Sequence, residues 1–439
     1  MNWHKQGRVV WMLLSMMAMV ADSRAADWPQ WRGPLLNGST PETVLPARWS
    51  KTEKVLWRAP LPGSSGATPV VWGNSVFVSS PDQDKNLWFF CLDARNGEVK
   101  WRAQVGSGNR TQGKNNLASP SAVTDGQRVI CLLGTGDLAA FDFSGRKIWG
   151  RDLSSEFGRF AFMFLYGSSP LLWENRLYVQ VIQRNPPTYS YVRDDKPERD
   201  SYLLCLDPAT GSTLWRHVRK TDARGESMEC YTTPLPYPEF NPTHVLVVGA
   251  NAITAHDPQT GKEAWTYPGV NLKKRSDGRI VPSAVVVSNL IYACGPKREL
   301  LVAFRGGPSG TLGEECVAWK STDDIPDVCT PLVYQGRLYV LDGDQQILTC
   351  YEPVTGRKIW RGKLDVREIF SASPTGADGK IYLLSEDGTA VVLSAGDRFE
   401  VLDRIPMGER PCYSSIAVAG RRLYIRTAAA LYCLGESQP

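Results

Sequence analysis

One short phrase recurs along the chain and constrains the fold more than any other feature. It reads Asp-x-x-(Thr/Asn)-Gly-x-x-x-Trp and occurs at 93–101, 207–215 and 257–265, with Glu in first place at 352–360 and a shortened copy at 142–149. Self-similarity at intervals of roughly 40–65 residues is typical of repeat architectures, in which each repeat is one supersecondary unit. The repeat therefore has to be understood before any individual motif.

A second phrase precedes each copy of the first. It begins with Ser or Thr near Pro, continues through apolar residues and a polar turn, and ends in an apolar run such as Arg337–Leu341. Each unit thus contains four short apolar or alternating runs separated by turn residues, which predicts a four-stranded antiparallel meander. The second phrase begins near Pro69, Pro120, Pro170, Pro234, Pro282, Pro331, Pro374 and Ser415.

These units predict an all-β fold, an eight-bladed β-propeller of four-stranded antiparallel blades, with seven blades as the alternative. Radial packing covers both faces of every sheet and leaves only short edges. The eighth unit, 413–435, has only three strands, and Val55–Arg58 resembles the missing tryptophan-bearing strand. We expect this N-terminal strand to close the ring. The repeat tryptophans should fill the space between neighbouring sheets; they are Trp57, Trp101, Trp149, Trp215, Trp265 and Trp360.

Residues 1–26 have the features of a secretory signal peptide. Lys5 and Arg8 precede an apolar run from Val9 to Ala21, and cleavage is expected after Ala25 or Ala26. This run is shorter than the ~20 residues that span a bilayer, although an uncleaved N-terminal anchor is an alternative. We expect residues 27–439 to form one exported domain, periplasmic or secreted. No cysteine precedes Cys91, so no lipid anchor is expected.

The charge of the chain excludes some partners. A formal net charge of +5 over 439 residues is too small to indicate a nucleic acid or an anionic membrane surface as the ligand. No later stretch approaches the length of a membrane-spanning helix, so the chain is not expected to span a membrane. The partner predicted at this stage is an unidentified protein or glycan.

The repeat phrase also resembles a known motif. Asp-Pro-Gln-Thr-Gly-Lys-Glu-Ala-Trp at 257–265 is similar to the tryptophan-docking motif of the propellers related to pyrroloquinoline-quinone (PQQ) enzymes. The opening Asp-Trp-Pro-Gln-Trp-Arg-Gly-Pro at 27–34 resembles the start of a group of exported bacterial PQQ-like propellers. The nearest functional analogy is the propeller lipoprotein of the outer-membrane β-barrel assembly machinery, although fold resemblance does not carry function with it.

The resemblance also implies parts that can be looked for. Quinoprotein dehydrogenases carry an adjacent Cys-Cys pair beside the quinone, a Ca²⁺ site and an Asp general base. None of the ten cysteines here is adjacent to another, and the chain has no Cys-x-x-Cys-His haem motif. We therefore expect no cofactor; a PQQ- and Ca²⁺-dependent oxidoreductase of alcohols or sugars is the alternative.

The cysteines and histidines are interpreted as structural, and no metal site is expected. Four cysteines take the same place in their repeats, which is typical of a small buried apolar residue; they are Cys91, Cys205, Cys350 and Cys433. Three others precede inner strands and should lie around the central channel: Cys230, Cys329 and Cys412. His217 and His256 lie beside repeat residues, without a partner at ligand spacing in the sequence.

A binding site is expected where loops converge at one face of the propeller, because loops on a rigid scaffold carry binding residues. These loops interleave aromatic and charged residues, which suits a sugar or an extended peptide. The candidate ligand-binding residues are Lys114, Asn116, Arg159, Tyr166, Glu229, Tyr231, Arg275 and Arg410.

The sequence thus predicts a non-catalytic, exported propeller that binds a ligand or a protein, with no catalytic residue assigned. Besides the oxidoreductase, a polysaccharide hydrolase or lyase is a further alternative, since Asp323, Asp324 and Asp327 could supply paired carboxylates. A charge run this short is usually only a solvated loop.

Overall fold

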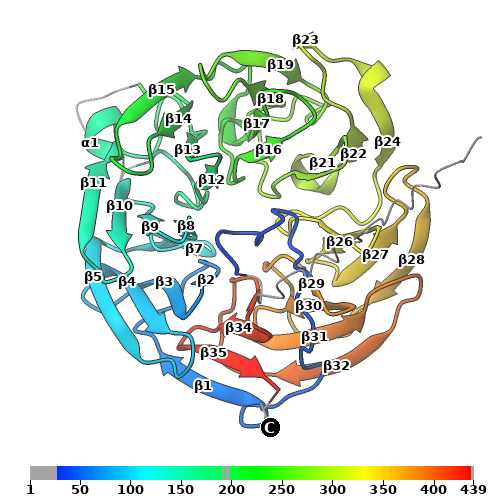
Figure 1. Ribbon diagram of the computed structural model, residues 1–439. Helices are drawn as coiled ribbons and strands as arrows, with labels where there is room; N and C mark the ends of the chain where they lie inside the picture. The colour runs from blue at the N-terminus through cyan, green and yellow to red at the C-terminus, as the bar shows by residue number, and fades with distance from the viewer. Residues whose placement is uncertain (1–26, 190–191, 193–197, 437–439) are drawn as a thin grey trace, which may run out of the picture.

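The computed structural model describes residues 27–189, 192 and 198–436, and it is an eight-bladed β-propeller (Figure 1). The predicted signal peptide lies outside the described residues. Each blade is a four-stranded antiparallel sheet, and blade 4 has an additional short strand. The predicted all-β class and the eight blades are confirmed; seven blades, the alternative, are excluded.

The strands of the first four blades follow one another along the chain, from the channel outward in each sheet. They are β2 (Val70–Trp72), β3 (Ser75–Pro81), β4 (Asn86–Asp93) and β5 (Val99–Ser107) in blade 1; β8 (Val123–Thr124), β9 (Arg128–Leu132), β10 (Asp137–Asp142) and β11 (Lys147–Asp152) in blade 2; β12 (Leu171–Trp173), β13 (Arg176–Val181), β14 (Tyr202–Leu206) and β15 (Thr213–Val218) in blade 3; and β16 (Leu235–Tyr237), β17 (His244–Gly249), β18 (Ala252–His256) and β19 (Glu263–Tyr267) in blade 4, with β23 (Gly310–Thr311) parallel to β19.

The last four blades repeat this order. They contain β20 (Val285–Val287), β21 (Leu290–Cys294), β22 (Leu301–Phe304) and β24 (Val317–Ser321) in blade 5; β25 (Leu332–Tyr334), β26 (Arg337–Asp342), β27 (Ile347–Tyr351) and β28 (Lys358–Lys363) in blade 6; β29 (Thr375–Ala377), β30 (Lys380–Leu384), β31 (Thr389–Ser394) and β32 (Val401–Pro406) in blade 7; and β33 (Ala417–Ala419), β34 (Arg422–Arg426), β35 (Ala430–Gly435) and β1 (Val55–Pro60) in blade 8.

The remaining elements are short and lie in the connections. They are the hairpin of β6 (Thr111–Gln112) and β7 (Asn115–Asn116), the helix α1 (Leu153–Phe157), and the 3₁₀ turns η1 (Gly225–Met228), η2 (Pro296–Arg298) and η3 (Glu314–Cys316). Among the described residues, no helix has both the length and the apolar character needed to cross a membrane.

Blade 8 joins the two ends of the chain. β1 pairs antiparallel with the C-terminal strand β35, with Trp57 opposite Cys433. The predicted closure of the ring by the N-terminal strand is therefore confirmed. Because this blade is made from both ends, the circle closes through a ladder of backbone hydrogen bonds rather than through side-chain packing alone.

Most of the repeat tryptophans connect their blade to the next one by a hydrogen bond; the Trp265 indole nitrogen is buried and has no partner among the described residues. The Trp57 indole donates to Ala94 O of blade 1 at 2.9 Å, and Trp101 donates to Phe143 O of blade 2 at 3.0 Å. The glycine of the receiving turn has a positive φ, as Gly97 does at 77°, and its missing Cβ makes room for the ring. The same indole-to-carbonyl bond is made by Trp149, Trp215, Trp319 and Trp360.

Each of these tryptophans lies opposite a small residue on the adjacent strand of its own blade. Cys433, Cys91, Cys205 and Cys350 face tryptophans in this way, and alanine takes the same place in three other blades. All four cysteines are fully buried, so their predicted role as small core residues is confirmed.

Trp319 of blade 5 belongs to the same series but was missed in the sequence. Its indole docks on the turn of blade 6, donating to Pro353 O at 2.7 Å. The segment before it contains β23 and η3, which interrupt the repeat phrase between the third strand of the blade and the tryptophan. The insertion hides the spacing, while the packing geometry is unchanged.

Candidate functional site

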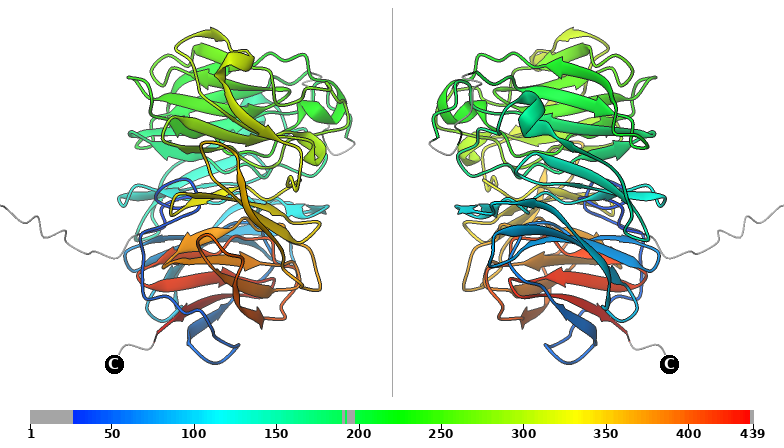
Figure 2. Two further views of the ribbon diagram at one scale, coloured as in Figure 1. Left: turned by 90° about the vertical axis from the view of Figure 1, so that its right-hand side faces the viewer. Right: turned by 90° about the vertical axis from the view of Figure 1, so that its left-hand side faces the viewer.

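The N-terminal segment 27–49 crosses the ring on one side before the chain enters blade 8 (Figures 1 and 2). Trp28 exchanges backbone hydrogen bonds with Val71 of blade 1, and Pro29 O accepts a hydrogen bond from blade 2. The Gln30 side chain accepts a backbone hydrogen bond from blade 3. These bonds hold the segment against three successive blades, across one opening of the channel.

Arg32 fixes the same segment to the opposite part of the ring. Its guanidinium donates to Pro331 O of blade 6 at 2.7 Å and to Pro374 O of blade 7 at 2.8 Å. The side chain is 3% exposed, and burial lowers the pKa of Arg32 to about 9. Since its guanidinium donates hydrogen bonds to backbone carbonyls of two blades, this arginine fixes the N-terminal segment at the end of the channel that the segment covers.

A ring of Ser and Thr side chains surrounds the channel, with one residue from each blade. In seven successive pairs the backbone N–H of one member donates to the hydroxyl of the next blade's member, at distances between 2.9 and 3.2 Å. The ring consists of Thr68, Ser121, Ser169, Thr233, Ser283, Thr330, Ser373 and Ser415. We call it the hydroxyl belt. The sequence phrase showed these residues at the start of inner strands but not that they bond to one another.

The belt has one open link, at the seam between the last and first blades. Thr68 Oγ1 is buried and has no hydrogen-bond partner among the described residues. The belt therefore links seven neighbouring blade pairs, whereas between blades 8 and 1 Arg426 donates to Ser79 O at 2.7 Å and to Gly63 O at 2.9 Å.

The channel contains a cavity of about 320 Å³, lined by seven members of the belt. Trp31 of the N-terminal segment also lines it, and so do three aromatic residues from the loops, namely Phe164, Tyr231 and Tyr413. Hydroxyls beside aromatic faces provide both hydrogen-bonding groups and an apolar surface for a ligand.

Charged groups at the cavity occur as matched pairs. Lys114 Nζ lies 2.6 Å from Glu386 Oε1 and donates to Ser371 Oγ at 3.0 Å. Arg279 contacts Glu226 at 3.0 Å and Asp327 at 3.2 Å. The Arg279 guanidinium also lies over the Phe164 ring, 4.8 Å from its centroid. The mouth is therefore polar without a large excess of one sign.

Two of the predicted site residues, Lys114 and Tyr231, line this cavity. Glu229 lies behind it: its side chain is fully buried and accepts from Met163 N at 2.6 Å and Tyr231 OH at 3.0 Å. Burial raises the pKa of Glu229 despite these donors and despite Arg184, 3.0 Å away. Glu229 thus holds the loop that carries Phe164 in place.

Two more predicted residues are fixed within the fold and do not line the cavity. Asn116 is 5% exposed and donates to Ser64 O at 2.7 Å. Tyr166 is 1% exposed, and its hydroxyl donates to Gln180 O at 2.8 Å. We interpret both as supports for the loops, because their polar groups are already bonded to backbone carbonyls.

The other three arginines lie on loops away from the cavity lining. Arg159 is exposed and lines a separate groove. Arg275 pairs with Asp277 at 2.7 Å and Glu299 at 2.9 Å. Arg410 is largely exposed, 3.9 Å from Glu368. The structure thus does not bring the eight predicted residues into one site; Arg279 and Trp31, absent from that set, do line the cavity.

The three cysteines expected around the channel lie behind its wall. Cys230, Cys329 and Cys412 are each at most 1% exposed, and none lines the cavity. Val328 and Thr330 line the cavity on either side of Cys329 in the chain, while the Cys329 thiol is directed to the backbone carbonyls of 370 and 372. The expected position at the channel is corrected accordingly, and packing accounts for all three.

The class defined by this fold and cavity is a β-propeller of PQQ-like repeats with a loop-lined channel mouth. The family model described as outer membrane protein assembly factor BamB matches residues 5–185, 188–307 and 316–401, and the chain belongs to this family. No curated protein matches the chain.

Solved structures share the fold at low sequence identity. BamB from Moraxella catarrhalis is 15% identical with a TM-score of 0.58, covering 86% of this chain and 98% of its own. A europium-containing methanol dehydrogenase is 10% identical with a TM-score of 0.69, covering 93% and 98%. A quinohemoprotein alcohol dehydrogenase from Comamonas testosteroni is 12% identical with a TM-score of 0.65, covering 94% and 81%. The same fold therefore occurs in an outer membrane protein assembly factor and in dehydrogenases, so the fold alone does not assign a function.

Proposed function

We propose that this chain is a non-catalytic, exported binding scaffold, periplasmic or secreted, that takes a ligand or a segment of a partner protein into the mouth of its channel. The observation that carries the proposal is the cavity itself, lined by the hydroxyl belt and aromatic rings and covered at one end by the N-terminal segment. A concave site with a few polar groups among apolar ones is the usual form of a binding pocket.

The state of the charged groups supports binding rather than catalysis. Glu386 faces Lys114, and Glu226 and Asp327 share Arg279, so each of these carboxylates already has a cation within about 3.2 Å. Such pairs can open to meet charges on a partner of either sign. Arg279 is central to this role, because it contacts two carboxylates and an aromatic ring at once.

The alternative is an oxidoreductase that holds PQQ and Ca²⁺. Calcium requires several oxygen ligands converging on one point. Of the two aspartates that line the cavity, Asp327 contacts Arg279 and Asp344 lies 3.9 Å from Arg298. The engagement of both aspartates with arginines lends the alternative less support than the scaffold, and we derive no step through a Ca²⁺–quinone pair.

Photo-crosslinking tests the binding proposal. A photoreactive phenylalanine analogue would replace Phe164 at the cavity, and Val354, an exposed residue on the outer turn of blade 6, in a control. We expect a discrete adduct from position 164 only, lost with Arg279→Ala but not with Arg361→Ala, which removes a surface ion pair to Asp324. If no adduct forms, immobilised glycans should be retained with the same dependence on Arg279. Failure of both tests would contradict the proposal.

A calorimetric titration with PQQ, with and without Ca²⁺, tests the alternative directly. We expect no heat of binding in either case. Micromolar, calcium-dependent binding would overturn the proposal and make alcohols and sugars the substrates to try.

A further inference from the structure

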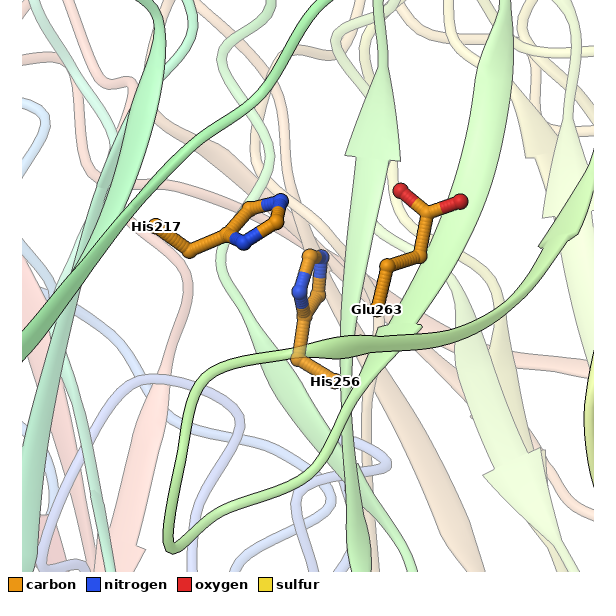
Figure 3. A group of neighbouring side chains, drawn as sticks. All are labelled: His217, His256 and Glu263. Carbon is orange, nitrogen blue, oxygen red and sulfur yellow. The ribbon is translucent and has the colours of Figure 1, made fainter.

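Two histidines that are far from any ligand spacing in the sequence lie together in the fold. His217 is on β15, the outer strand of blade 3, and His256 ends β18 of blade 4. Their rings are 4.7 Å apart between centroids, at 61°. Glu263, at the start of β19, is the direct cross-strand neighbour of His256. One ligand atom from each of the three lies within 4.8 Å of the others (Figure 3).

We propose that His217, His256 and Glu263 form a binding site for a zinc-class divalent metal ion at the seam between blades 3 and 4. The site is separate from the channel and does not depend on the proposed scaffold function. It would join two blades through coordinate bonds, in addition to the contact of Trp215 with the turn at Gly261.

The hydrogen bonds of His256 already orient it as a metal ligand. Its Nδ1 lies 3.1 Å from Gly261 O, and a carbonyl can only accept, so Nδ1 carries the proton. The Nε2 lone pair is therefore available as a donor to a metal. An imidazole that gives its other N–H to a backbone carbonyl is the usual outer-shell arrangement of a metal-binding histidine.

In the absence of a metal, the Thr254 hydroxyl donates a hydrogen bond to the Nε2 lone pair of His256. Thr254 Oγ1 lies 2.9 Å from His256 Nε2 and accepts a hydrogen bond from Arg219 Nε at 2.9 Å, so its own hydrogen is directed to Nε2. A metal ion would displace this weak donor. Rotation of the hydroxyl leaves its bond from Arg219 intact.

The other two groups lack competing partners. Within the described part of the chain, the side chains of His217 and Glu263 make no hydrogen bond and no ion pair.

The three ligand atoms would have to move slightly closer together to bind a small ion. Zinc binds histidine nitrogen at about 2.0–2.1 Å, which places two tetrahedral ligands roughly 3.3 Å apart. Glu263 is exposed and His217 only half-buried, so these side chains can move towards His256. Two imidazoles with one carboxylate favour zinc, copper or nickel over calcium, which prefers oxygen ligands.

One nearby charge opposes the ion. Arg219 is 3% exposed and is fixed by bonds to Thr254 Oγ1, Gly249 O and Ala252 O. The negative charge of Glu263 offsets it in part. We therefore expect an affinity below that of closed four-ligand structural zinc sites, and a fourth position filled by water.

The test uses tag-free mature protein stripped with a chelator, titrated with Zn²⁺ by calorimetry and followed by thermal unfolding. We expect one ion per chain and a higher Tm with Zn²⁺ but not with Ca²⁺. His217→Ala and Glu263→Gln should each weaken binding by about tenfold or more. Both positions are partly exposed, so these variants should fold. His244→Ala, a histidine outside the group, is the matched control and should bind as the parent does.

Cobalt(II) supplies a second readout, because its visible spectrum reports the ligands directly. We expect a nitrogen- and oxygen-ligated spectrum in the parent and in His244→Ala, lost in His217→Ala. No saturable binding, equal stabilisation by Ca²⁺, or binding unchanged in His217→Ala would each overturn the proposal.

Discussion

The Trp57 indole of blade 8 lies directly against Gly97 of blade 1. A Cβ placed on Gly97 would be 2.6 Å from the ring, and the indole nitrogen donates to Ala94 O at 2.9 Å. This contact crosses the seam where the two ends of the chain meet, which is also where the hydroxyl belt lacks a link. Docking of Trp57 is therefore one of the contacts that close the seam, together with Arg426 of blade 8, whose guanidinium donates to Ser79 O of blade 1 at 2.7 Å.

Replacing Gly97 tests this contact. Gly97→Ala should destabilise the protein by about 1–3 kcal/mol more than Gly73→Ala, because the added methyl overlaps a ring that cannot move away. Gly73 is the matched control: it also has a positive φ, 53°, but nothing lies within 4 Å of its Cβ position. Trp57→Ala should cost about 3–5 kcal/mol. Equal costs for the two glycine variants in urea unfolding would contradict the role of the contact.

The open link in the belt predicts different effects of one substitution at two positions. Thr330 Oγ1 accepts the backbone N–H of Ser283 at 3.0 Å, so Thr330→Val leaves a buried donor unpaired and should cost about 1–3 kcal/mol. Thr68→Val removes a buried hydroxyl that has no partner among the described residues and should be nearly neutral. Denaturant unfolding of both variants decides the point, and a similar cost at the two positions would count against the open link.

The architecture could be predicted from the sequence because most blades carry the same phrase, with its glycine and tryptophan at the same separation. The sequence located the strand that closes the ring, since Trp57 stands in the same local pattern as Trp101. Trp319 was missed because the insertion with η3 breaks that pattern while leaving the three-dimensional contact intact. The pattern within a strand determines whether that strand forms, and an insertion in the loop before the strand does not change this. The insertion changes only the spacing by which the repeat is recognised.

Contacts between blades were not predictable in the same way. His217 and Glu263 come together only because β15 and β19 belong to adjacent blades, and the cavity wall combines residues from many repeats. Tyr166 is the opposite case. It lies in a loop and was predicted to bind a ligand, but its side chain is buried and its hydroxyl donates to Gln180 O. Exposure is decided by tertiary packing, which the composition of a loop does not report.

The first residue of the repeat phrase predicts a dependence of stability on pH. Asp142 accepts hydrogen bonds from Ser144 and Arg146, and these lower its pKa to about 2 from an ordinary value near 4. Its stabilising contribution is therefore present above about pH 4 and is lost as the pH falls towards 2. Asp142→Asn should be less stable than the parent at pH 7, and the gap should narrow at pH 2.5. A gap of constant size at both pH values would contradict this linkage.

The buried thiols give the last prediction. All ten cysteines are free thiols, nine of them buried; burial raises the pKa of Cys205 to about 11 and that of Cys131 to about 12. Because the thiolate is the reactive form, these thiols should resist alkylation in the folded protein. Only Cys316, which is partly exposed, should be modified slowly, and Cys316→Ser should abolish this labelling. Mass spectrometry after alkylation in guanidinium should then find all ten thiols modified. Labels missing in pairs, with a further mass decrease of two hydrogens for each pair, would instead reveal a disulfide that forms in the exported protein.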